Sequence, residues 1–164
     1  MSITVEQVLP ILSGKDTWKA AFEIQLTDSG GQPVGEKLQF DGIFTTDGQI
    51  YFWGFGPEQN TEGWVFRLDF RRSDFVPGVP YTAGSGGFSA LLIQGGDQMI
   101  RGGFVIGGTM RIDEMDPEHG RVRGRFENVV TEAGGRPDGS EMEPAYASRI
   151  TFVCEGGTLE MPAR

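Results

Sequence analysis

The sequence predicts an all-β protein, an antiparallel β-sandwich of about nine to ten strands. Three observations support this prediction. From Trp18 onward, apolar and polar residues alternate with a period of two, as in strands that bury one face. Glycines and prolines separate the alternating runs, and 26 of the 164 residues, about 16%, are glycine, against a usual proportion near 7%. No strand–helix alternation occurs, which excludes a doubly wound nucleotide-binding fold. An antiparallel barrel is the other arrangement that such strands adopt.

The expected strands follow one another at short spacing. "GWVFRLDFRR", residues 63–72, alternates most clearly, with Trp64 and Phe66 on the apolar face. "QIYFWGF", residues 49–55, follows an aspartate–glycine pair that favours a hairpin with the preceding strand. A long polar loop, the segment with the least expected order, occupies residues 133–144. The other expected strands lie at 18–27, 37–46, 88–94, 98–108, 109–115, 121–129 and 148–161.

The chain is expected to form a single β-sandwich domain, residues 14–164, preceded by an N-terminal segment, residues 1–13. In "VEQVLPILSG" the apolar residues have helical spacing, Thr4 is a candidate helix cap, and Gly14 is a stop signal. Pro10 interrupts helical hydrogen bonding, so at most a short or kinked helix is expected in this segment.

The acidic composition limits the partners that the protein can bind. A formal net charge of −9 opposes nucleic-acid binding, which depends on cationic side chains at phosphates, and it disfavours an anionic membrane surface. No run approaches the roughly 18 apolar residues of a membrane span, and no signal peptide is visible. A soluble protein is expected, either cytoplasmic or exported with its leader removed. The single cysteine, Cys154, is expected in the core, so neither a disulfide nor a cysteine metal cage is predicted.

The stretch "MRIDEMDPEHGRVRGRF" contains the only histidine, His119. The pattern favours a hairpin whose apolar residues share one face, with a five-residue loop that ends at Gly120 and with Asp113 facing Arg123. His119 is then a solvated loop residue rather than a catalytic base. A calcium site at Asp113–Glu118 is the less favoured alternative and stays open, because alternation sends neighbouring carboxylates to opposite faces. No catalytic or metal-binding residue is therefore predicted.

Several short motifs resemble those of uncharacterised bacterial β-sandwich lipoproteins. The matching stretches are "GKDTWKA" at 14–20, "GVPYTAG" at 78–84, "GTMRIDEMD" at 108–116, "GRVRGRF" at 120–126 and "ITFVCEGGTLEM" at 150–161. This resemblance implies an immunoglobulin-like or related sandwich. It carries over no catalytic residues, because no activity is established for that family. The chain differs from the family in having no lipidation cysteine near its start, which puts a membrane anchor in doubt.

The strand "QIYFWGF" has apolar residues on both faces. Ile50 and Phe52 can fill the core, whereas Tyr51, Trp53 and Phe55 share the face that an antiparallel strand usually turns to water. Three neighbouring aromatic side chains can expose a patch of the size that marks a contact site. The sequence therefore predicts that the N-terminal segment, a partner chain or a ligand covers this face.

These observations favour a non-catalytic structural or protein-interaction module that works without a cofactor. Its partner would be another protein, in a larger assembly or a homo-oligomer. The alternative is a small-ligand or glycan-binding protein, because aromatic strands can stack on sugars or line the mouth of a barrel. An enzyme is the third and least favoured class, since no nucleophile motif accompanies the single histidine.

Overall fold

The computed structural model describes residues 16–46, 50–55, 63–70, 75–84, 88–95 and 99–158. Within these ranges the side chains at 16–17, 45–46, 50–51, 53–55, 99 and 156–158 are not described. The N-terminal segment, for which the sequence predicts at most a short helix, lies outside the described residues.

Nine strands and one short 3-10 turn make up the described elements. They are β1 (Asp16–Thr27), β2 (Leu38–Thr46), β3 (Ile50–Phe55), β4 (Gly63–Phe70), β5 (Pro80–Thr82), β6 (Phe88–Gly95), β7 (Met99–Asp116), the turn η2 (Pro117–His119), β8 (Arg121–Thr131) and β9 (Tyr146–Thr158). Every ladder between these strands is antiparallel. The predicted all-β, antiparallel class is therefore confirmed.

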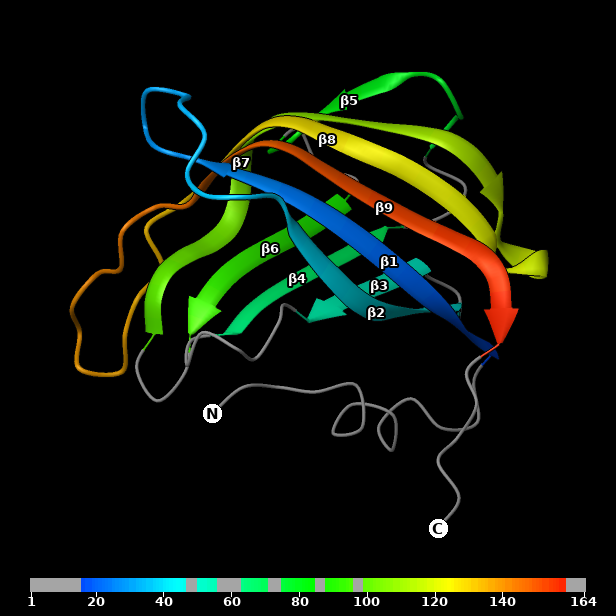
Figure 1. Ribbon diagram of the computed structural model, residues 1–164, viewed down its shortest axis with the longest axis horizontal. Helices are drawn as coiled ribbons and strands as arrows, with labels where there is room; N and C mark the ends of the chain where they lie inside the picture. The colour runs from blue at the N-terminus through cyan, green and yellow to red at the C-terminus, as the bar shows by residue number, and fades with distance from the viewer. Residues whose placement is uncertain are drawn as a thin grey trace, which may run out of the picture.

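The described strands belong to one curled sheet in the order β5-β7-β6-β4-β3-β2-β1-β9-β8 (Figure 1). Because β8, the last strand of this order, also pairs with β7, the sheet curls back on itself, and β5 stays at the edge beside β7. The length of β7, 18 residues, allows this closure: residues 99–104 pair with β6, and residues 105–116 pair with β8. The described strands thus form one barrel-like sheet, and the two separate sheets of an immunoglobulin-like sandwich are not confirmed.

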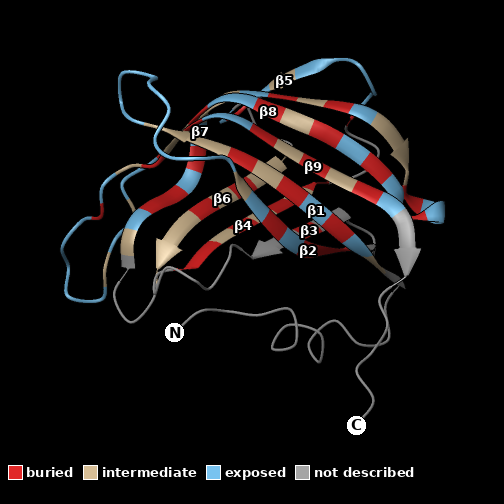
Figure 2. Ribbon diagram, in the orientation of Figure 1, coloured by how far each residue is buried: buried red, intermediate tan, exposed pale blue. Residues whose placement is uncertain are grey.

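Phenylalanine fills the inner side of the curled sheet. Buried residues alternate with more exposed ones along the strands (Figure 2). Phe66, Phe126 and Phe152 are wholly buried. The rings of Phe66 and Phe126 meet edge to face, with 5.9 Å between centroids. Such pairs contribute about 0.5–1.5 kcal/mol beyond the burial of their area. This core holds the strands in fixed positions, so side chains at the strand ends can form a defined site.

The β7–β8 hairpin packs against one end of the core. Gly120 has a φ of 66° in the left-handed region, as predicted, and a Cβ at this position would lie 2.5 Å from the ring of Trp18. The loop spans 117–120, one residue fewer than predicted, because Asp116 pairs with Arg121. The apolar face of the hairpin is buried as predicted, and it consists of Met110, Ile112, Val122 and Phe126.

The predicted pairing of Asp113 with Arg123 is wrong. A bulge before Glu114 puts that residue opposite Arg123. The Asp113 carboxylate lies instead 3.5 Å from the guanidinium of Arg125. A bulge adds one residue to one strand and shifts the register beyond it, and alternation over so short a stretch does not reveal the shift.

The exposed end of this hairpin should tolerate substitution of its histidine. The side chain of His119 is 76% exposed, and its Nδ1 lies 2.9 Å from the Asp116 carboxylate. We expect His119→Ala to change the free energy of unfolding by no more than about 0.5 kcal/mol, because exposed ion pairs contribute little. Chemical denaturation of both proteins measures the difference. A loss above about 1 kcal/mol would contradict the description of His119 as a solvated turn residue.

Candidate functional site

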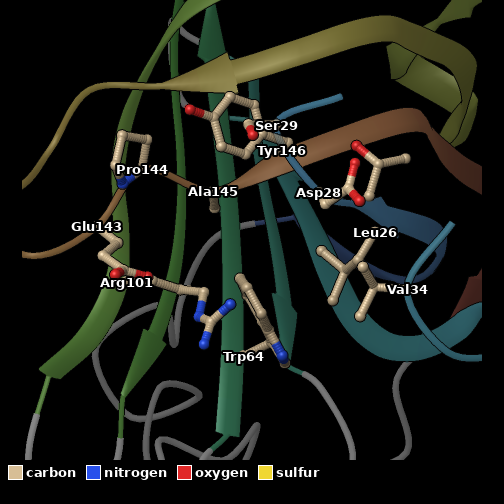
Figure 3. A pocket seen from close by; sticks show the side chains of 11 residues that line it. Leu26, Asp28, Ser29, Val34, Trp64, Arg101, Glu143, Pro144, Ala145 and Tyr146 are labelled. Atoms are coloured by element: carbon tan, nitrogen blue, oxygen red, sulfur yellow. The ribbon is translucent and has the colours of Figure 1, made fainter. Parts of the chain in front are cut away.

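A pocket of about 440 Å³ opens at the end of the sheet that lies away from the β7–β8 turn (Figure 3). Its walls come from the end of β1, the β1–β2 connection, the starts of β4 and β7, and the connection into β9. This volume falls within the usual range of small-molecule pockets, about 300–1,000 Å³. The residues that line the pocket are Leu26, Thr27, Asp28, Ser29, Val34, Trp64, Arg101, Glu143, Pro144, Ala145 and Tyr146.

A row of side chains across three adjacent strands borders the pocket. Trp64 of β4 pairs in register with Gln94 of β6, and Gln94 pairs with Arg101 of β7. Trp64 is 8% exposed and starts the buried series of β4, so the row lies on the inner side of the sheet, next to the phenylalanine core. Figure 3 shows Leu26 and Val34 across the pocket from Arg101. The pocket therefore has apolar surface beneath it and on one side.

One wall is the connection between β8 and β9, which folds over the start of β7. The Gly102 N–H donates to the carbonyl of Glu143 at 2.8 Å, and the Gly134 N–H donates to the carbonyl of Gly102 at 3.1 Å. The buried hydroxyl of Thr131 accepts a hydrogen bond from the Ala145 N–H at 2.9 Å. The sequence indicated little order for this loop, because hydrogen bonds between distant backbone groups leave no local pattern.

The opposite rim is the turn between β1 and β2. The Asp28 carboxylate accepts hydrogen bonds from the N–H groups of Gly30 and Gln32, at 2.9 and 3.0 Å. Aspartate commonly stabilises a turn in this way. The Val34 N–H donates to the carbonyl of Leu26 at 2.9 Å, which holds the half-exposed Val34 side chain beside the pocket.

The charges of the pocket are the guanidinium of Arg101 and the carboxylates of Asp28 and Glu143. Figure 3 shows the guanidinium beside Trp64 and directed into the pocket. With respect to the described residues, the Arg101 side chain makes neither a hydrogen bond nor an ion pair, whereas Arg125 contacts two carboxylates. The site thus combines an available cation with apolar surface and hydrogen-bonding groups.

The aromatic residues predicted as the contact face, Tyr51, Trp53 and Phe55, belong to β3, but their side chains lie outside the described residues. Phe52 between them is buried in the core, so alternation puts the three positions on the outer side of the sheet. The pocket is on the inner side. The predicted face and the pocket are therefore separate surfaces.

Described residues on that outer side are partly shielded from water. Ile43 is opposite Trp53 in register, faces away from the core, and is nevertheless wholly buried. On β4, the Arg67 guanidinium lies 3.6 Å from the Asp69 carboxylate and 5.9 Å from the centroid of the Phe104 ring. Burial raises the pKa of Asp69 above its ordinary value, and the charge of Arg67 partly opposes this shift. Whether the face of Tyr51, Trp53 and Phe55 is covered stays a prediction.

Deletion of residues 1–13 tests what covers this face. We expect the N-terminal segment to cover it through Val5, Val8, Leu9 and Leu12. The free energy of unfolding should then fall by at least about 2 kcal/mol, the amount for burying one or two such side chains, and the emission of Trp53 should shift to the red. Chemical denaturation followed by tryptophan fluorescence measures both. If neither changes while Trp53→Ala weakens self-association or ligand binding, the face belongs to a partner or a ligand. If neither the deletion nor Trp53→Ala has any effect, the prediction of a covered face is contradicted.

The pocket was not predicted from the sequence. Alternation placed Trp64 correctly on an inner face, but Arg101 in "QMIRGGF" was not recognised. The available signal was the glycine pair that follows Arg101. A Cβ at Gly103 would lie 2.9 Å from the carbonyl oxygen of Glu132, so the missing side chain lets the β8–β9 connection approach β7. An arginine in a strand, next to glycines that let another segment approach the backbone closely, is a candidate site residue.

No protein-family model, curated protein or solved structure gives a significant match to the chain. The resemblance to bacterial β-sandwich lipoproteins therefore stays a prediction. In the ranges that the structure describes, no three histidine, cysteine, aspartate or glutamate side chains are grouped closely enough to hold a metal ion. Those ranges also contain no helix with the length and apolar character that crossing a membrane requires. The fold and the pocket define a small antiparallel β protein with a concave site at one end of its sheet.

Proposed function

We propose that this protein is a non-catalytic binding protein for a small ligand, which occupies the pocket at the end of the sheet. The observation that supports this most directly is the meeting of Trp64, Arg101 and Leu26 around about 440 Å³ of space. Small-molecule sites are typically concave and largely apolar, with a few polar groups that orient the ligand. The pocket is concave, and its lining is divided about equally between apolar and polar surface.

The absence of catalysis is part of the proposal. Acyl transfer by a serine or cysteine triad needs a histidine as base, and the only histidine of the chain, His119, lies on η2 at the other end of β8. The two carboxylates of the pocket are on opposite rims. Asp28 stabilises the β1–β2 turn, and the backbone of Glu143 is bonded to β7. The Asp28 carboxylate therefore has a structural role.

A pocket-blocking variant tests the proposal. Ser29 lines the pocket and is exposed, so Ser29→Trp should fill the opening without disturbing the core. Ser148→Trp is the matched control, because Ser148 is exposed on β9 and does not line the pocket. Ligand-observed NMR with a panel of small acids, amines, sugars and lipids should identify compounds that bind the wild type and Ser148→Trp but not Ser29→Trp. Hits that bind all three proteins equally, or no hits at all, would contradict ligand binding at this pocket.

A protein-interaction module is the second candidate function. Phe104 and Ile106 are 45% and 53% exposed at alternate positions of β7, although large apolar side chains usually avoid water. A partner protein or a second copy of the chain would bury them. Analytical ultracentrifugation of the wild type and of Phe104→Ser tests this candidate. A dimer that dissociates in the variant favours it, and a monomer that captures no partner contradicts it.

A further inference from the structure

We infer that the ligand of this pocket carries a single carboxylate, which the guanidinium of Arg101 holds, attached to an uncharged apolar body that lies against Leu26, Val34 and Trp64. This inference rests on the proposed function and specifies the chemical class of the ligand. Three features of the site support it: an available guanidinium, two acidic side chains at the rims, and an apolar wall.

Arg101 is positioned to bind an anion. It comes from a backbone that is fixed on both sides, because Arg101 pairs with Gln94 and because the next residue, Gly102, donates its N–H to the Glu143 carbonyl at 2.8 Å. Its side chain has no partner among the described residues and points into the pocket beside Trp64 (Figure 3). The planar guanidinium matches a carboxylate with two parallel hydrogen bonds. Arg101 is exposed to solvent, and the indole of Trp64 supplies apolar surface beside its charge.

The acidic residues at the rims limit the charge of the ligand. Asp28 and Glu143 line the same pocket as Arg101, so the lining carries more negative than positive charge. A phosphate with two negative charges would be attracted by one guanidinium and repelled by two carboxylates. A cationic ligand would be attracted by the carboxylates, but the positive charge of Arg101 would repel it where the ligand contacts Trp64. A single negative charge placed at Arg101, with no other charge on the ligand, meets the fewest unfavourable contacts.

The other residues that line the pocket determine the polarity of the rest of the ligand. Leu26 and Val34 lie across the pocket from Arg101, and Trp64, which also lines the pocket, belongs to the buried core cluster. Val34 is 50% exposed, so a ligand that covers it removes apolar surface from water. The ligand is therefore amphipathic, with its charge at one end and a compact apolar group at the other.

Three matched probes test this inference: naphthylacetate, the neutral naphthylacetamide and the cationic naphthylethylamine. Titration calorimetry should give an affinity for the acid at least about tenfold higher than for the amide, because a charge-assisted bidentate pair is worth more than a neutral hydrogen bond. Arg101→Gln should reduce this ratio to about one. The control Arg121→Gln removes the same charge at the other end of β8, where Arg121 lies 3.5 Å from Glu114, and should leave the ratio unchanged.

Several outcomes would overturn the inference. They are equal binding of acid and amide, tighter binding of the amine, or a preference for the acid that survives Arg101→Gln. If none of the three probes binds while the wider panel yields ligands that Ser29→Trp excludes, the carboxylate class is wrong and the proposed function stands. If the panel yields no such ligand, the proposed function itself fails.

Discussion

Phe126→Ala should lower the free energy of unfolding by about 3–5 kcal/mol, the usual loss when a buried phenylalanine is truncated. Phe126 is wholly buried on β8. Its ring lies 5.9 Å from that of Phe66, 5.8 Å from that of Phe88 and 6.0 Å from that of Phe152, between centroids. These rings come from three other strands, so the cavity would lie where both halves of the closed sheet meet.

The matched control is Phe104→Ala, the same chemical change at a side chain that is 45% exposed. We expect this control to cost no more than about 1 kcal/mol, because the lost area was only partly removed from water. Chemical denaturation of both variants gives the comparison. Similar losses at the two positions would contradict the arrangement in which β8 closes the sheet over an aromatic core.

Gly102→Ala should lower stability by roughly 2–6 kcal/mol and should weaken ligand binding at the pocket, because two penalties add at this residue. Its φ of 103° is one that side chains rarely adopt, and an added Cβ would overlap the carbonyl oxygen of Leu92 on β6. Gly102 also bonds through its N–H to Glu143 and through its carbonyl to Gly134. A shift of its backbone would therefore move the β8–β9 connection and the adjacent Arg101.

Gly139→Ala separates these penalties. Gly139 has a φ of 89°, but a Cβ there would meet no atom within 4 Å. This variant should cost only about 1 kcal/mol from the backbone conformation, and it should bind ligand as the wild type does. Chemical denaturation and ligand titration of both variants give the comparison. A Gly102→Ala protein as stable as Gly139→Ala would show that β6 and the β8–β9 connection do not approach β7 as closely as described.

Much of the local structure follows from the sequence. The alternation in "GWVFRLDFRR" predicts the buried face of β4, and Trp64, Phe66 and Leu68 are buried there. The pattern around the single histidine predicts the β7–β8 hairpin, its apolar face and the left-handed Gly120. These features depend on neighbouring residues, because the pleat of a strand and the φ of a turn are local properties.

The closure of the sheet and the pocket depend on residues that are distant in the chain. Alternation assigns an inner face to Trp64, but it neither places Arg101 on that face nor indicates which strands pair. The long β7 joins β6 at one end and β8 at the other, which makes the described strands one curled sheet. That choice depends on the twist of the strands and on the packing of the shared aromatic core. Only the folded chain brings Leu26 and Tyr146 to the same pocket as Arg101, since their contact is a result of pairing and curvature rather than of local preference.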